Sequence, residues 1–186
     1  QWPAQEPVID PQFAPDGSAV GYINPSGEMR VSDGINDRAI FSPEKADVYY
    51  GQAEFVASEE MDRMHGFWWA PDSSALIVEQ TNDSQVQSWW ISDPATPSKQ
   101  PQEVHYPAAG TTNATVGLAK IAVTGKTQPI IWDNDAFEYL ISVIWQKDCD
   151  ALITVADRSQ QNFVTYALTE AGLKNVHEIT DHEFVE

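Results

Sequence analysis

One phrase of about ten residues occurs three times in the chain, and it limits the fold more than any other feature. The copies run from Phe13 to Tyr22, from Trp69 to Val78 and, more weakly, from Trp145 to Thr154. Each has an aromatic residue at the end of one apolar run, then a polar turn, then a second apolar run. Proline presets φ in such a turn, and Asp with Gly or Ser accepts the remaining geometry. Each copy therefore predicts a β-hairpin, and the recurrence predicts a repeat architecture.

Further short strands are expected around these hairpins, in segments rich in β-branched and aromatic residues that are bounded by turn residues. They are Gly21–Ile23, Glu28–Ser32, Gln85–Ile91, Thr115–Val123, Tyr139–Ile144 and Asn162–Leu168. Two stretches rich in proline, glycine and small polar residues, 92–101 and 107–112, are expected to be loops. The one helix candidate is Ser58–Met64, with Ser58 as its N-cap and the acidic pair Glu59 and Glu60 in its first turn.

These elements predict an all-β fold, specifically a partial β-propeller of about three blades of four-stranded antiparallel sheet, with one short helix. A β-sandwich also has many short strands, and the pattern alone leaves it open. Closed propellers have ~4–8 blades, so three cannot close a ring. We therefore expect residues 1–186 to be a fragment of a larger domain. Its blade edges would be exposed, which favours self-association into a homodimer.

Charge narrows the range of partners. The chain has 28 acidic residues against 10 basic ones, a formal net charge of −18. Such a field repels nucleic acid and anionic membrane surfaces, and its natural complement is a cationic ligand. The sequence contains no apolar run of the ~18 residues that a membrane-spanning helix needs. Cys149 is the only cysteine, which excludes an internal disulfide and a cysteine-based zinc site.

A family resemblance is carried by the segment from Gly51 to Asp72, which reads GQAEFVASEEMDRMHGFWWAPD, and continues through Tyr106–Gly110. This segment resembles the double-glutamate region of the dipeptidyl peptidase IV family, in the prolyl oligopeptidase clan of serine peptidases. The likeness is specific from Pro7 to about Val123 and general from Thr127 onward. It implies a bacterial N-terminal β-propeller, in a periplasmic or secreted protein whose α/β-hydrolase domain lies later in the same polypeptide.

The resemblance implies that Glu59 and Glu60 bind the free α-amino group of a peptide substrate. An ammonium group has three donors and no acceptor, so two carboxylates can satisfy it. Holding the amine also sets the distance from the bound N-terminus to each peptide bond of the substrate, because an extended chain spans ~3.3–3.6 Å per residue. A serine placed about two residues away then releases dipeptides. The resemblance implies Pro or Ala in the second position of the substrate.

We expect no catalytic residue in this chain, because the Gly-x-Ser-x-Gly turn that exposes the nucleophile of an α/β-hydrolase does not occur in it. No cofactor or metal is expected either. His177 and His182 match no common zinc spacing, and residues around them are expected to form a solvated acidic tail. An alternative function stays open: a non-catalytic propeller that binds other proteins, in which Glu59 and Glu60 are ordinary surface residues.

Two smaller expectations concern single side chains. Arg63 either lines the far end of the substrate cleft or pairs with Glu59 at the i,i+4 spacing of a helix, and the second interpretation is favoured. Trp68-Trp69 and Trp89-Trp90 lie on expected strands, where neighbouring residues face opposite sides. One tryptophan of each pair is therefore expected in a core and the other against the next blade.

Overall fold

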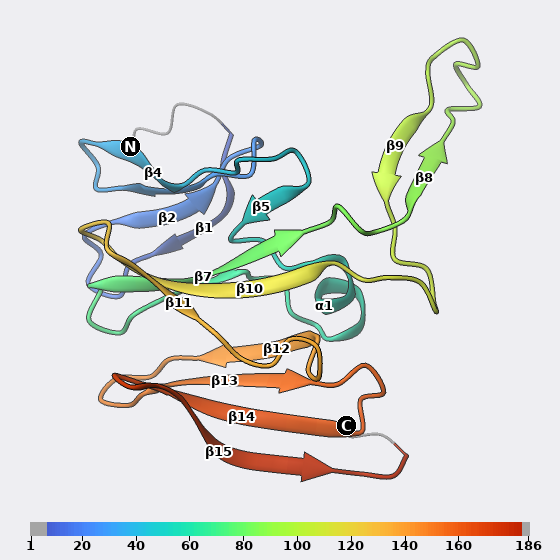
Figure 1. The fold of residues 1–186 in the computed structure, drawn as a ribbon. Coiled ribbons are helices and arrows are strands. Elements are labelled where there is room, and N and C mark those ends of the chain that lie inside the picture. Colours follow the sequence, from blue (N-terminus) through green and yellow to red (C-terminus); the bar gives the residue numbers. More distant parts are fainter. Residues whose placement is uncertain (1–6, 184–186) are drawn as a thin grey trace.

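The computed structural model describes residues 7–183, and in this part of the chain it consists of β-strands and one short helix (Figure 1). Three antiparallel sheets lie side by side. The first has the order β1-β2-β3-β4. Its strands are β1 (Ile9–Phe13), β2 (Val20–Ile23), β3 (Met29–Ser32) and β4 (Asp37–Phe41).

The second and third sheets follow along the chain. The second has the order β11-β10-β7-β5, and β6 pairs with β7 as well. Its strands are β5 (Val48–Tyr50), β6 (Phe67–Trp69), β7 (Ala75–Asn82), β10 (Thr115–Ala122) and β11 (Thr127–Ile130). The third has the order β12-β13-β14-β15. Its strands are β12 (Tyr139–Ile144), β13 (Ala151–Ala156), β14 (Asn162–Thr169) and β15 (Gly172–Thr180). The expected all-β fold and partial propeller of about three blades are confirmed.

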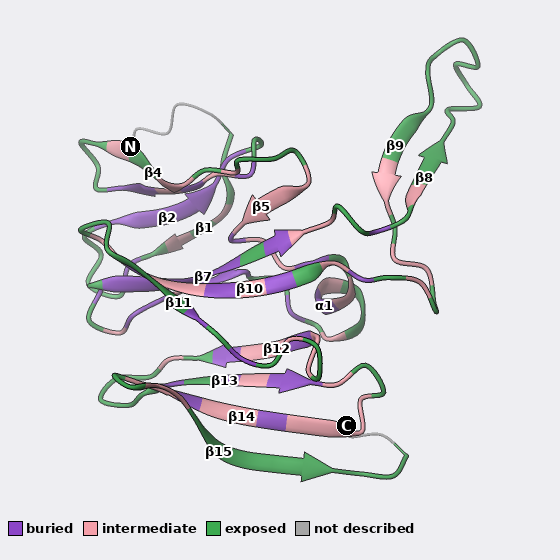
Figure 2. Ribbon diagram, in the orientation of Figure 1, coloured by how far each residue is buried: buried purple, intermediate pink, exposed green. Residues whose placement is uncertain are grey.

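The two hydrophobic cores meet on β7. Leu76 and Val78 belong to the core shared with the first sheet, whereas Ile77 belongs to the core shared with the third. Successive side chains of a strand point to opposite faces, so a strand covered on both sides needs a continuous apolar run. Residues 75–78 provide that run, and all four are buried (Figure 2). The middle sheet therefore holds the other two together.

The repeated phrase forms the same turn in its first two copies. The N–H of Gly17 donates to the carbonyl oxygen of Ala14 at 2.8 Å, and the N–H of Ser73 donates to that of Ala70 at 2.8 Å. The fourth residue of each turn has a positive φ, 74° at Gly17 and 63° at Ser73. The turns also touch, because the N–H of Asp16 donates to Ser73 Oγ at 3.1 Å. Equivalent turns thus lie next to each other on neighbouring sheets.

A two-stranded hairpin projects away from the sheets at the upper right of Figure 1. It consists of β8 (Ser88–Ile91) and β9 (Gln102–His105), and we call residues 88–105 the arm. The strand expected over Gln85–Ile91 is thus shorter than predicted. Trp89 and Trp90 are 47% and 59% exposed, so the expectation that one of them is a core residue is wrong. Among the described residues, no third strand pairs with β8 or β9. For the other pair the expectation is confirmed: Trp69 lies in one core and Trp68 packs against the other.

The C-terminal segment around His177 and His182 is exposed to solvent, as expected, but much of it is a strand rather than a tail. Residues 172–180 form β15, which pairs with β14, and His177 lies on this strand. Most of β15 is exposed, because it is the edge strand of the third sheet. An edge strand can form through backbone hydrogen bonds to one neighbour, without alternating apolar side chains. The sequence of β15 therefore carries only a weak hydrophobic pattern.

Candidate functional site

The expected binding pair lies in a loop that interrupts one strand position of the middle sheet. β5 pairs with the end of β7 (Tyr50 opposite Gln80), and β6 pairs with its beginning (Phe67 opposite Val78). Between them the chain leaves the sheet, and an isolated bridge between Gln52 and His65 closes this excursion. We call residues 52–65 the α1 loop, because they contain the helix α1 (Phe55–Glu60).

The helix begins earlier than the sequence predicts. Its N-cap is Glu54 rather than Ser58, and the Glu54 carboxylate accepts hydrogen bonds from the N–H groups of Val56 and Ala57, both at 2.6 Å. Ser58 instead lies inside the helix, where its hydroxyl donates to the carbonyl oxygen of Phe55. The helix ends at Glu60, and Asp62 follows with a left-handed φ of 51°. Glu59 and Glu60 therefore occupy the last turn, and their expected place in the first turn is wrong.

The two carboxylates face solvent. Both residues are exposed, and among residues 7–183 no hydrogen bond or ion pair joins either side chain to another group. Helix C-termini carry partial negative charge from their free carbonyl groups. The pair and the helix end are therefore all negative, and this arrangement favours a positively charged ligand over a neutral one.

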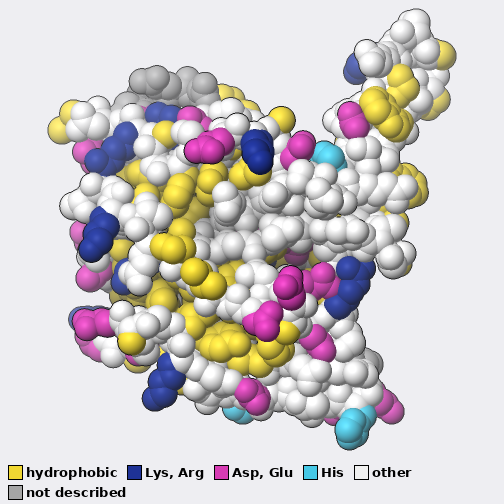
Figure 3. All heavy atoms as spheres, in the orientation of Figure 1, with side chains coloured by type: hydrophobic (Ala, Val, Ile, Leu, Met, Phe, Trp, Pro, Cys, Tyr) yellow, Lys and Arg dark blue, Asp and Glu magenta, His cyan; other side chains and the backbone are white. Residues whose placement is uncertain are grey.

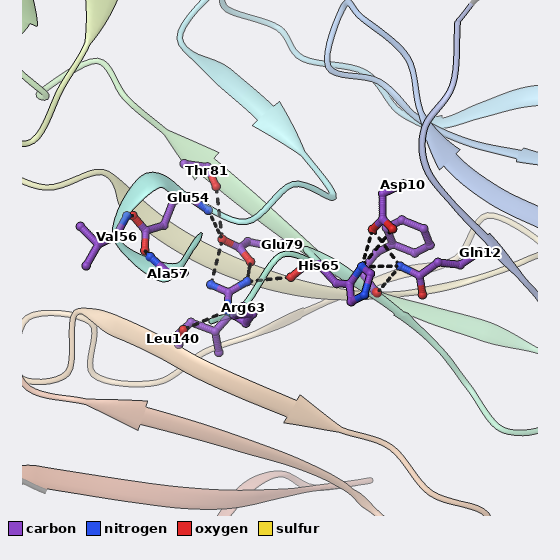
Figure 4. A network of polar contacts seen from close by, with 11 residues as sticks. Asp10, Gln12, Glu54, Val56, Ala57, Arg63, His65, Glu79, Thr81 and Leu140 are labelled. Carbon is purple, nitrogen blue, oxygen red and sulfur yellow. Dashed lines mark hydrogen bonds and ion pairs between the residues drawn. The ribbon is translucent and has the colours of Figure 1, made fainter. Parts of the chain in front are cut away.

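Arg63 does not pair with Glu59, contrary to the favoured expectation. It is 8% exposed, so it does not line an open cleft either. Its Nη1 donates to Glu79 on β7, and its Nη2 lies 3.4 Å from the same carboxylate (Figure 4). Its Nε donates to the carbonyl oxygen of Leu140 on β12 at 3.2 Å. Arg63 thus connects the α1 loop to two sheets.

Glu79 is a buried charged residue next to the candidate site that the sequence analysis does not single out. It is fully buried, at the point of β7 where β5 has ended and β6 has not begun. Burial raises the pKa of Glu79 to about 7, against the opposing effect of the Arg63 guanidinium. Burial also raises the pKa of Glu54, and its hydrogen bonds from Val56 and Ala57 oppose that shift. The sequence does contain a signal for Glu79, because it directly follows the apolar run 75–78. An acidic residue that continues a buried strand needs a charged partner.

The α1 loop also contacts the first sheet. His65 Nδ1 lies 2.8 Å from Asp10 Oδ2 on β1, and Gln12 Nε2 donates to the same oxygen at 2.9 Å (Figure 4). An aromatic row continues from the loop toward the arm. Phe55 packs edge-on against Tyr106, whose ring packs edge-on against Trp89. The loop that carries Glu59 and Glu60 is therefore anchored to all three sheets and lies next to the base of the arm.

The described residues contain no group of three or more His, Cys, Asp or Glu side chains arranged to hold a metal ion. They also contain no helix of sufficient length and hydrophobicity to span a bilayer.

Comparison with known proteins gives three kinds of match. Residues 1–186 match the family described as "Dipeptidyl peptidase IV (DPP IV) N-terminal region". Dipeptidyl peptidase 8 of mouse and of human are each 29% identical to the chain over 75 residues, or 36% of it. Dipeptidyl peptidase 4 of the cat is 28% identical over 112 residues, or 57% of the chain. These matches span 8%, 8% and 15% of the relatives' own lengths.

Among solved structures, the crystal structure of Porphyromonas gingivalis dipeptidyl peptidase 4 superimposes with a TM-score of 0.86. The match covers 97% of this chain and 27% of that one, at 18% sequence identity. This likeness shows a shared fold.

Proposed function

Because this chain belongs to the family of dipeptidyl peptidase IV N-terminal regions, we propose that it is the propeller portion of a serine-type dipeptidyl peptidase. In this proposal Glu59 and Glu60 bind the free α-amino group of a peptide, and the propeller walls limit access to the catalytic centre. The catalytic serine belongs to an α/β-hydrolase domain of the same polypeptide, and the chain by itself hydrolyses nothing.

The observation that carries the proposal is that Glu59 and Glu60 are exposed and have no cationic partner among the described residues. The two adjacent carboxylates lie on a loop fixed to three sheets. Adjacent like charges repel, and an arriving ammonium group relieves that repulsion. Each hydrogen bond between a carboxylate and the ammonium contributes ~1.5–3 kcal/mol net. A neutral N-terminus recovers none of this charge-assisted energy.

The fixed amine explains the expected product. An extended peptide advances ~3.3–3.6 Å per residue, so a nucleophile about two residues from the amine-binding pair cuts after the second residue. The substrate class is therefore peptides with a free N-terminus, and the preference for Pro or Ala in the second position follows from the family.

The first test compares two substrates on the whole peptidase. An N-acetylated Gly-Pro chromogenic amide is expected to react at least about a hundredfold more slowly than the free-amine form, since acetylation removes the positive charge. Steady-state kcat/KM for both substrates is the measurement. Equal rates would contradict amine binding, and a whole protein that cleaves neither substrate would support the alternative of a propeller that binds other proteins.

We also propose that the whole protein forms a homodimer in which the arm contacts a second copy. Hydrophobic side chains gather on the surface of the arm in Figure 3, and Trp89, Trp90 and Ile91 are 47%, 59% and 59% exposed. Large aromatic residues are the side chains that most often dominate the energy of protein interfaces.

The dimer is tested by changing the two tryptophans. Trp89→Ser with Trp90→Ser is expected to weaken self-association at least about tenfold, because each buried interface tryptophan contributes more than 1 kcal/mol. Sedimentation velocity over a concentration series measures this, with Ile35→Ser, an 87% exposed residue away from the arm, as the matched control. A parent protein that is monomeric at all concentrations would contradict the proposal.

A further inference from the structure

We propose that Arg63 is a positioning residue, which holds the Glu59 and Glu60 pair in place through its buried ion pair with Glu79. This inference rests on the proposed function, because it explains how the amine-binding pair keeps its position.

The helix that carries the pair cannot hold its own position. α1 has six residues, and isolated helices shorter than ~12–15 residues are marginal in water. The side chains of Glu59 and Glu60 make no hydrogen bond or ion pair within residues 7–183. The place of the two carboxylates is therefore set by the backbone that precedes and follows them.

Arg63 fixes the backbone that follows. Its N–H donates to the carbonyl oxygen of Ala57 at 3.1 Å, so the residue is tied back onto the helix itself. Its guanidinium then bonds outward in three directions: to Glu79 on β7, to the carbonyl oxygen of Leu140 on β12, and to that of His65 at 2.9 Å. Only two residues separate Arg63 from Glu60, so a shift of the guanidinium carries the acidic pair with it.

Glu79 fixes the backbone that precedes the helix. The N–H of Glu54 donates to Glu79 Oε1 at 3.3 Å, and the Glu54 side chain caps the first turn of α1. The same carboxylate therefore receives a bond from each end of the helix, from Glu54 at the start and from Arg63 beyond the end (Figure 4). The backbone of Glu79 is held as well, by its bonds to Gly51 and Gly66, both at 2.8 Å.

This arrangement goes beyond what folding of the sheets needs. The strands β5, β6 and β10 pair with β7 through their backbones, and the Glu79 carboxylate takes no part in that pairing. The carboxylate instead serves the α1 loop, which forms no part of a sheet beyond its closing bridge between Gln52 and His65. We therefore assign the pair to the position of the acidic residues.

The test uses the whole peptidase with Arg63→Lys. A lysine keeps the charge next to Glu79 but has a single ammonium, which cannot reproduce the planar fork that reaches Glu79 and Leu140 together. The expected result is a KM for a free-amine Gly-Pro chromogenic amide that rises about tenfold to a hundredfold, since small misplacements of binding groups cost that much. The kcat is expected to change less than about threefold, because the catalytic domain is untouched.

Two controls separate positioning from loss of structure. Arg30→Lys alters a comparable arginine, which bonds Glu28 and Asp37 in the first sheet and has no contact with the α1 loop, and its KM is expected to equal that of the parent. Hydrolysis of p-nitrophenyl acetate, which offers no amine, reports an intact catalytic domain and is expected to be unchanged in both variants.

The result that overturns the inference is a folded Arg63→Lys protein with the parent KM. Should that variant not fold, the double variant Arg63→Met with Glu79→Met decides, because it leaves no unpaired buried charge and such replacements are often tolerated. The same rise in its KM supports the inference, and the parent KM overturns it. Glu59→Gln with Glu60→Gln is measured in parallel: if this variant raises KM and the others do not, only the positioning role fails, and if it does not, the amine-binding function itself fails.

Discussion

Replacing Glu59 and Glu60 together by glutamine is expected to lower kcat/KM of the whole peptidase for a free-amine substrate by about a hundredfold to ten-thousandfold. Glutamine keeps the size of the side chain and one acceptor oxygen but loses the negative charge. Two charge-assisted hydrogen bonds of ~1.5–3 kcal/mol each are weakened, and every ~1.4 kcal/mol corresponds to a factor of ten. Each single variant is expected to lose a smaller part of the activity.

The measurement is the ratio of kcat/KM between parent and variant on a free-amine Gly-Pro chromogenic amide. Glu170→Gln is the matched control, because Glu170 is also an exposed acid but lies in the turn between β14 and β15. An unchanged ratio for the double variant would identify Glu59 and Glu60 as ordinary surface acids. That result would support the alternative function, a non-catalytic propeller that binds other proteins.

The second large effect is expected from Gly66→Ala, which should destabilise the fold by ~3 kcal/mol or more. A Cβ at this position would press against the backbone carbonyl carbon of Gln52 and lie 2.5 Å from both Gln52 N and Gly51 C. Overpacking usually costs ~1–3 kcal/mol, and here the obstacle is backbone rather than a side chain that can rotate. The bridge between Gln52 and His65 would have to open.

Gly117→Ala is the matched control for this prediction. Gly117 lies in β10, and the nearest atom to its added Cβ would be Gln80 Oε1 at 3.9 Å, so the substitution is expected to be neutral or slightly stabilising. Urea unfolding followed by tryptophan fluorescence gives both free energies of unfolding. Equal stability of the two variants would show that the backbone at Gln52 yields more easily than its geometry indicates.

The blades could be predicted because their signals are local. A turn such as Ala14–Ser18 needs only its own residues, and the apolar run at 75–78 announces a strand covered on both faces. Short edge strands such as β4 and β9 escaped prediction, because backbone pairing with a neighbour is enough to form them and leaves little trace in the sequence.

The site shows where local rules stop. Serine ranks high among N-caps and glutamate does not, so Ser58 was the better choice from sequence alone. Glu54 caps the helix in a buried position close to Arg63 and Glu79. The pairing of β5 and β6 with β7 brings these residues together, and a local sequence rule does not include it. The i,i+4 rule likewise suggested Glu59 for Arg63, but α1 ends before Arg63 and a buried carboxylate from another strand offers the stronger partner.

The closure of the α1 loop at its base has a consequence for how such a binding site can diversify. The backbone bridge between Gln52 and His65 closes the loop at its base, so pairing of β5 and β6 with β7 does not depend on backbone bonds from the residues between them. We therefore expect the length and charge of this loop to be changeable while the blade keeps its register. The same loop placed in another blade would need both its arginine and a buried acidic residue on the strand beside it. Ligand preference and blade stability would then change separately, except at the contacts of Arg63, Glu54 and His65 that tie the loop to the sheets.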